Sequence, residues 1–149
     1  MRTSIKGPWS ADEVEAFLND CRYPKRLACV GSDGYPRVVS VWFIHEAGKL
    51  FCASHSASHL VAMLRANGKV GFEVATNDPP YFGVRGQADA VLADSGGAAM
   101  LERLLERYLG GVESPLAKWL LSRSEDELLI TLTPNRLFSW DYRQRMEKL

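Results

Sequence analysis

The sequence lacks an excess of charge of either sign. Lys and Arg together number 18, Asp and Glu together also number 18, and the formal net charge at pH 7 is zero. Proteins whose main partner is nucleic acid usually present a basic surface to the phosphate backbone. The even balance therefore argues against nucleic acid as a partner.

Long apolar runs are also missing. The longest apolar stretches fall far short of the roughly 20 residues that a membrane-spanning helix needs. The segment from Met1 to Ser10 lacks the apolar core of a secretory signal peptide. We therefore expect no membrane partner and a cytoplasmic location.

Cysteine is sparse. Cys21, Cys29 and Cys52 are odd in number and show no C-x-x-C spacing, which indicates neither a disulfide framework nor a cysteine metal site. Buried apolar thiols in a reducing compartment are the simpler interpretation.

A chain of 149 residues without repeats, low-complexity tracts or linkers is expected to fold as a single domain, residues 1–149.

The pattern of turns and apolar residues predicts mostly strands. Ser10 and Glu13 form a capping-box pattern ahead of a helix over about Ala11 to Asn19. Further helices are expected at Ser56–Asn67, Ala98–Leu109 and Pro115–Arg123. Strands are expected at Leu27–Val30, Arg37–His45, Lys49–Ala53, Val70–Ala75 and Phe82–Ala93, and in two segments of the tail, around Leu128–Leu132 and Phe138–Trp140. Hairpin-linked strands with few helices indicate an antiparallel α+β domain, a small β-barrel.

The segment from Ser54 to His59 carries the clearest chemistry. It lies where a predicted strand ends and a helix begins, so free backbone N–H groups and the positive end of the helix dipole meet hydroxyl and imidazole groups there. This arrangement suits a phosphate. The alternative is that Ser56 or Ser58 is an ordinary N-cap. His55 and His59 are four residues apart, but no third ligand is evident, so we predict no metal site.

A series of short motifs resembles one known family. The series consists of Arg26-Leu27-Ala28, Asp33-Gly34, Pro36–Val39, Val41–Phe43, Ser58, Leu64–Val70 and Gly83–Ala88. In order and spacing it resembles the FMN-binding split barrels related to pyridoxamine 5'-phosphate oxidase. The resemblance implies an antiparallel split β-barrel with a few flanking helices.

The resemblance also implies a homodimer with a flavin at its interface. Arg37, Val38, Val39 and Ser40 would line the flavin ring, and Ser54, Ser58 and His59 would hold its phosphate. Trp42, Gln87, Arg136 and Trp140 would complete the pocket. Each side chain also has an ordinary alternative, as strand core for Val38, Val39, Trp42 and Trp140 or as an exposed polar residue for Gln87 and Arg136.

One position departs from the family pattern. Many relatives carry a basic pair after the phosphate-site serine, whereas this chain has His59-Leu60. Charge-assisted bonds are about twice as strong as neutral ones, so a weaker phosphate site is expected here. FMN is the expected cofactor, with FAD or a deazaflavin as alternatives.

Three functions fit these features. The first is a flavin-dependent oxidoreductase acting on a small molecule, with the flavin supplying the chemistry, so that no catalytic side chain is predicted. The second is a flavin-binding sensor or carrier without turnover. The third is haem binding, for which His45, His55 and His59 are the candidate axial ligands.

Overall fold

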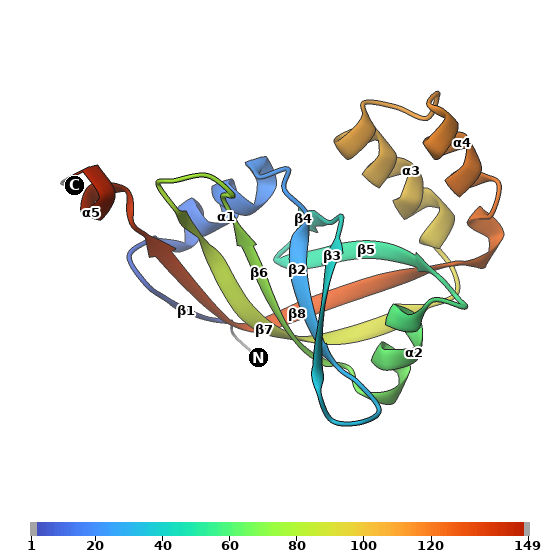
Figure 1. Ribbon diagram of the computed structural model, residues 1–149, viewed down its shortest axis with the longest axis horizontal. Helices are drawn as coiled ribbons and strands as arrows, with labels where there is room; N and C mark the ends of the chain where they lie inside the picture. The colour runs from blue at the N-terminus through green and yellow to red at the C-terminus, as the bar shows by residue number, and fades with distance from the viewer. Residues whose placement is uncertain (1–2, 148–149) are drawn as a thin grey trace.

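The computed structural model describes residues 3–147, which form one β-sheet and five α-helices (Figure 1). The strands are β1 (Ser4–Lys6), β2 (Lys25–Val30), β3 (Pro36–Val41), β4 (Ile44–Glu46), β5 (Lys49–His55), β6 (Lys69–Ala75), β7 (Phe82–Ala93) and β8 (Glu127–Asp141). The helices are α1 (Ala11–Asp20), α2 (His59–Ala66), α3 (Gly97–Leu109), α4 (Pro115–Leu121) and α5 (Arg143–Glu147), with a 3-10 turn η1 (Ser124–Asp126) before β8.

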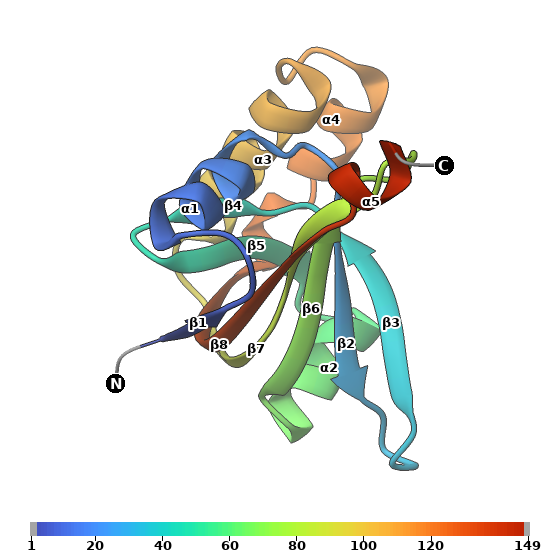
Figure 2. The same cartoon turned by 90° about the vertical axis from the view of Figure 1, so that its left-hand side faces the viewer.

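The sheet is a curved, open barrel. Its strand order is β3-β2-β6-β7-β8-β5-β4 with antiparallel neighbours, while β1 pairs in parallel with β8. Strand β3 lies at one end of this order and the β5–β4 hairpin at the other, yet the curvature brings β3 and β5 toward each other (Figures 1 and 2). The expected antiparallel split barrel of the α+β class is therefore confirmed.

The strand predicted over Arg37–His45 is wrong in its middle. The chain breaks at Trp42 and Phe43, where it leaves β3 at one end of the sheet and begins β4 at the other. Phe43 is fully buried in the barrel, whereas Trp42 packs against the cluster beneath α3 and α4. Residues that favour strands run through this whole segment without a break. The sequence alone therefore could not show that the chain passes here from one end of the sheet to the other.

The two tail segments form one strand, β8, which contains a bulge. Gln87 pairs with Arg136 and Ala88 pairs with Pro134, so Asn135 is an extra residue on β8. A bulge of this kind changes which side chains face inward. Ile130 and Leu132 face the core before the bulge, and Leu137 and Ser139 do so after it. The bulge therefore turns Arg136 and Phe138 toward the outside of the barrel.

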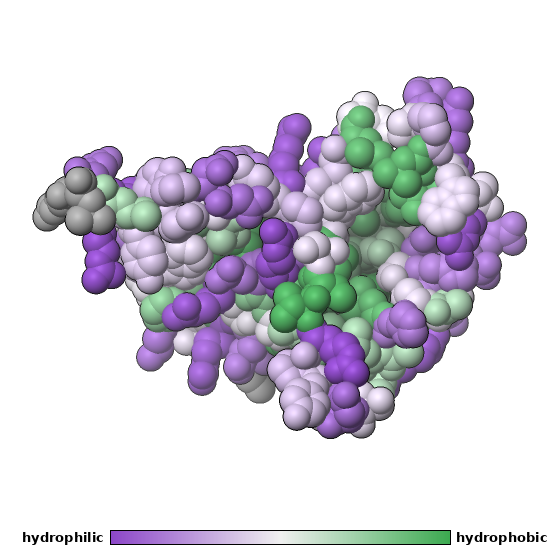
Figure 3. Space-filling view, viewed as in Figure 1, coloured by the Kyte–Doolittle hydropathy of each residue, from purple (hydrophilic) through white to green (hydrophobic). Residues whose placement is uncertain are grey.

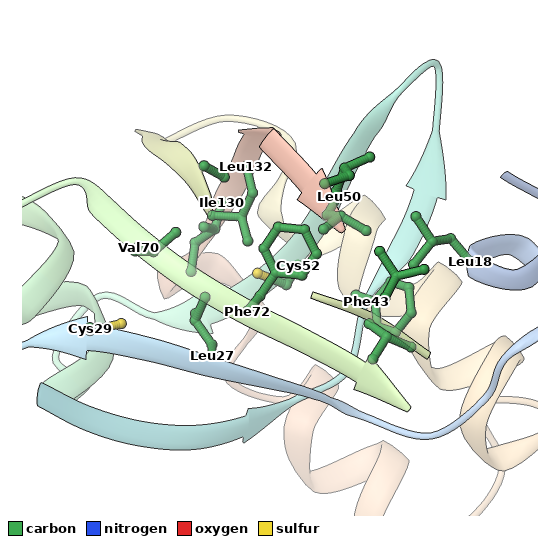
Figure 4. Packing of buried hydrophobic residues seen from close by; sticks show 14 of the residues in the cluster. Leu18, Leu27, Cys29, Phe43, Leu50, Cys52, Val70, Phe72, Ile130 and Leu132 are labelled. Atoms are coloured by element: carbon green, nitrogen blue, oxygen red, sulfur yellow. The ribbon is translucent and has the colours of Figure 1, made fainter. Parts of the chain in front are cut away.

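The barrel interior holds the main core (Figure 4). Leu27 of β2, Phe72 of β6 and Leu132 of β8 meet Phe43 and Leu18 there. All three cysteines are free, and Cys29 and Cys52 are buried in this core.

A second, smaller cluster lies outside the barrel. Leu101 and Leu105 of α3 and Ala117 of α4 enclose it, with Trp42 and Ala53 packed against them. The α3–α4 pair thus covers the outer side of β5, apart from the other helices (Figure 1).

Capping residues set where α1 and α2 begin. Ser10 and Glu13 form the predicted capping box of α1. Helix α2 begins at His59, three residues later than the Ser56 expected, because Ser58 is its N-cap, and α4 ends at Leu121. Within residues 3–147 there is no helix with both the length and the apolar character needed to cross a membrane.

Candidate functional site

The split of the barrel leaves two strand edges free. In the described part of the chain, β3 pairs with β2 alone, and residues 52–55 of β5 pair with β8 alone. Unpaired edges present backbone N–H and C=O groups that can bind a ligand. Two hollows lie along this split, and a third lies on the outer face of the sheet.

The first hollow, which we call the β3–α2 groove, has a volume of about 600 Å³. Strand β3, the β2–β3 turn and α2 form its walls, and its lining consists of Val30, Gly31, Ser32, Arg37, Val38, Val39, His59, Ala62, Met63 and Ala66. Arg37 and His59 are its titratable groups. The structure therefore brings together a permanent cation from β3 and the first residue of α2.

Arg37 is held in place by the turn before it. Its Nη1 and Nη2 donate to the two carboxylate oxygens of Asp33, each at 3.1 Å, and the Tyr35 N–H donates to the same carboxylate. The Arg37 guanidinium lowers the pKa of Asp33. A Cβ at position 31 would collide with the guanidinium, so Gly31 leaves the space in which Arg37 lies.

The predicted phosphate residues are divided between two hollows. His59 lines the β3–α2 groove with Arg37, whereas Ser54 lines the second hollow. Ser58 caps α2 by accepting from the Val61 N–H, and its Oγ lies 2.8 Å from Ser54 Oγ. The two hydroxyls thus bond each other at the point where the hollows approach.

The second hollow, the split pocket, has a volume of about 300 Å³. Ser40, Val41 and Trp42 line it from the β3 side, and Ala53, Ser54 and His55 line it from β5. Leu101, Leu104 and Leu120 of the two covering helices, with Arg123 and Glu127, complete the lining. In Figure 3, apolar side chains gather over β3 and over α4, with a recess between them.

Glu127 is a site residue that the sequence did not reveal. It is the first residue of β8, it is 7% exposed, and its Oε2 is buried without a hydrogen-bond partner among the described residues. Burial raises the pKa of Glu127. A glutamate at the start of a strand normally faces solvent, and only the packing of α3 over β5 and β8 encloses this one.

The third hollow, the outer-face hollow, has a volume of about 500 Å³ and lies on the outer surface of the sheet. Val38, Gln87 and Arg136 line it together with Arg26, Ala28, Gly71, Phe72, Glu73, Arg85, Gly86 and Phe138. Gln87 donates to Asn135 at 2.8 Å. Val38 lines both this hollow and the β3–α2 groove, so the two surfaces adjoin at β3.

Trp140 lies two residues beyond Phe138 on β8. Its ring packs 5.4 Å from that of Tyr142, and its Nε1 is buried without a partner among residues 3–147. None of the three hollows described above includes it in its lining.

The sequence of this chain matches a known protein family along most of its length. The sequence model described as pyridoxamine 5'-phosphate oxidase matches residues 10–141. This chain belongs to the pyridoxamine 5'-phosphate oxidase family. No curated protein matched its sequence.

Several solved structures share the fold of this oxidase-family chain. A conserved hypothetical protein from Mycobacterium tuberculosis superposes with a TM-score of 0.78 at 21% identity, covering 98% of this chain and 93% of its own. A protein described as an F420 reductase gives a TM-score of 0.66 at 24% identity, covering 80% and 92%. A FAD-binding protein from Mesorhizobium loti gives 0.62 at 21%, covering 88% and 93%.

The three histidines of this oxidase-family chain lie in three different places. His45 bonds Asn19 at 2.8 Å, and burial lowers its pKa. His55 accepts the Ala57 N–H on Nδ1, whereas His59 lines the β3–α2 groove. Among the described residues no three His, Cys, Asp or Glu side chains form a group able to hold a metal ion. The structure therefore does not bring the three candidate axial ligands together.

Proposed function

We propose that this chain binds a flavin, FMN in the first instance, along β3 and acts as a flavin-dependent oxidoreductase on a small molecule. One observation carries the proposal: Arg37 and His59 line the same groove along the unpaired edge of β3. The family membership supports a flavin, and relatives of the same fold include proteins described as FAD-binding and as an F420 reductase.

The phosphate would lie at the Arg37 end of the groove, so Arg37 would bind the phosphate and not the ring edge that the family resemblance implied. Arginine binds phosphate through charge-assisted hydrogen bonds, and the first turn of α2 adds free backbone N–H groups beside His59. Arg37 would add a charge that the His59-Leu60 position lacks, but a phosphate would have to compete with Asp33 for its outer nitrogens. Ser54 and Ser58 would contribute at the far side, as a hydroxyl pair.

The ring would extend along β3 toward Trp42. The five steps from Arg37 to Trp42 span about 17 Å of extended strand, which allows a phosphate at one end and a ring system at the other. Val38, Val39 and Ser40 would contact the ring through the free strand edge. The flavin would supply the redox chemistry, and these residues would orient it and exclude water.

A second copy of the chain would cover the outer-face hollow. Val38 is 67% exposed and Phe138 38% exposed on this surface, and large exposed apolar side chains that gather on one face mark an interaction site. Gln87 and Arg136 lie on the same face, so a symmetric dimer would place them near the groove of the partner. This arrangement would form the homodimer that the family resemblance implies.

The test is a spectrum followed by titrations. Purified protein is examined for flavin absorption, and released or added FMN, FAD and F420 are compared with riboflavin, which lacks the phosphate. Arg37→Ala is expected to weaken the binding of FMN about tenfold or more and to leave the binding of riboflavin nearly unchanged. Arg65→Ala removes an exposed arginine of α2 that does not line the groove and serves as the matched control.

The outcomes separate the possibilities. A colourless protein that binds none of the three cofactors at tens of micromolar contradicts the proposal. An equal loss in Arg37→Ala and Arg65→Ala would show only a general effect of charge. Steady consumption of NADH or NADPH by the flavin-loaded protein supports an oxidoreductase.

A binding protein without turnover is the second candidate. It is favoured by the Asp33 carboxylate, which already occupies both outer nitrogens of Arg37 and competes with a phosphate. A flavin-loaded protein that is not reduced by NADH, NADPH or reduced F420 would establish this candidate instead.

A further inference from the structure

The split pocket has an uneven lining. Trp42, Val41, Ala53 and the leucines of α3 and α4 make most of it apolar. The groups at its other end are His55, Arg123 and Glu127, which come from the facing ends of β5 and β8 and from the turn before η1. His55 and Glu127 are direct partners across the β5–β8 pair.

Each of these three groups can donate a hydrogen bond. The Ala57 N–H donates to His55 Nδ1 at 3.1 Å, so the neutral ring carries its proton on Nε2, which lies 3.6 Å from Asp126 Oδ2. The Arg123 guanidinium lies over Trp119, 4.9 Å from the ring centroid, and lines the pocket with N–H groups that can donate. Glu127 donates when it is protonated.

Glu127 has a buried carboxyl oxygen, Oε2, without a hydrogen-bond partner among the described residues. A buried carboxyl oxygen without a partner is costly, and the cost is removed when a ligand supplies the missing hydrogen bond. The charged groups that face Glu127 are His55 from β5 and Arg123 from the turn, with Asp126 behind His55, while α3 presents Leu101 and Leu104. Burial raises the pKa of the Glu127 carboxyl by more than the neighbouring His55 and Arg123 lower it. Arg123 lines this end of the pocket with N–H donors, and the protonated form of Glu127 offers another, so a ligand acceptor would satisfy both groups.

We infer that the split pocket binds a small carboxylate with an apolar body, whose oxygens pair with Arg123 and supply the missing partner of the buried Glu127 carboxyl. The apolar body lies against Trp42 and the leucines. A volume of about 300 Å³ is at the lower limit for small-molecule sites and fits a single ring. Binding takes up a proton once the pH exceeds the pKa of Glu127, because an ionised Glu127 would repel the ligand.

The ligand is a candidate substrate of the proposed oxidoreductase, and only this part of the inference rests on the proposed function. Ser40 and Trp42 belong both to the ring end of the flavin position and to the split pocket. A carboxylate in the pocket would thus lie beside the ring. Binding itself needs no flavin.

The test is a calorimetric titration of the flavin-free full chain with benzoate, repeated at several pH values from about pH 5 to pH 8. We expect benzoate to bind, with an affinity that falls about tenfold per pH unit above the pKa of Glu127. Glu127→Gln keeps the shape and a donor but cannot titrate, so it is expected to bind benzoate without this slope. Arg123→Ala, at an exposed position, is expected to lose about tenfold in affinity.

Two matched variants complete the test. Glu125→Gln removes an exposed carboxylate two residues earlier and should behave as the original chain. His55→Gln should keep the pH slope, which separates Glu127 from the imidazole. The inference is overturned if benzoate does not bind at millimolar concentration, or if the slope disappears in His55→Gln and persists in Glu127→Gln. A chain that binds benzoate but not flavin supports the pocket and contradicts the proposed cofactor.

Discussion

Trp42 stacks on Tyr108, with the ring centroids 5.1 Å apart and the planes 7° from parallel. Tyr108 lies on α3, and its hydroxyl contacts both the backbone N–H and the carbonyl oxygen of Phe43 at 3.3 Å. The pair therefore fastens the α3–α4 helices to the point where the chain passes from β3 to β4, and it holds one wall of the split pocket.

This pair predicts a graded loss of stability. Tyr108→Ala removes the stack and the hydroxyl and should lower the free energy of unfolding by about 2 kcal/mol, whereas Tyr108→Phe keeps the stack and should cost about 1 kcal/mol. Urea titration followed by tryptophan fluorescence measures both. Equal effects of the two variants would show that the stack contributes nothing.

Gly31→Ala should weaken the binding of the ligand and leave the stability of the fold nearly unchanged. Gly31 does not adopt a left-handed backbone, and the added methyl meets the flexible end of Arg37, so the side chain moves aside at little cost in stability. The displaced guanidinium should weaken FMN binding about tenfold and leave riboflavin binding unchanged. Fluorescence titration with both flavins checks this, and unchanged FMN affinity would remove Arg37 from the phosphate site.

A charge on the outer face should separate the proposed dimer. Phe138→Asp replaces an exposed ring of the outer-face hollow with a carboxylate that an interface would have to desolvate, and light scattering at micromolar concentration should then report a monomer. Leu116→Asp is the control, because Leu116 is 49% exposed on α4 and lies outside that hollow. If the unmodified chain is itself a monomer, the proposed interface is wrong.

Asp141 should make the free energy of unfolding depend on pH in the acidic range. Hydrogen bonds from Arg143, with a further bond from Trp9 Nε1 at 3.1 Å, lower the pKa of Asp141 from 3.8 to about 2. A carboxyl with a lowered pKa stabilises the fold above its unfolded pKa, and this contribution is lost as the pH falls from about 4 through 2.

Asp141→Asn should therefore cost at most about 2 kcal/mol at pH 7 and almost nothing near pH 2. Denaturant unfolding at the two pH values measures the difference. Asp89→Asn, which affects only the exposed pair with Lys69, should show little effect at either pH. A constant cost for Asp141→Asn at both pH values would mean that the charge is not the cause.

The sequence alone determined the elements whose signals are local. The Ser10–Glu13 capping box predicted the start of α1, and alternation predicted β6 and β7 at nearly their observed bounds. Such signals depend on hydrogen bonds and side-chain periodicity among neighbouring residues, which the sequence displays directly. The collinear motifs then led to the family, and with it to the split barrel that the structure confirms.

The tertiary structure alone decided how the site residues are combined. It joined Arg37 to His59, paired Ser54 with Ser58, and turned Arg136 outward through the bulge at Asn135. It also enclosed Glu127 beneath α3, which ends at Leu109, well before Glu127 in the chain. Burial and the pKa shifts that follow from it depend on residues that meet only in the folded chain, so no local pattern could show them.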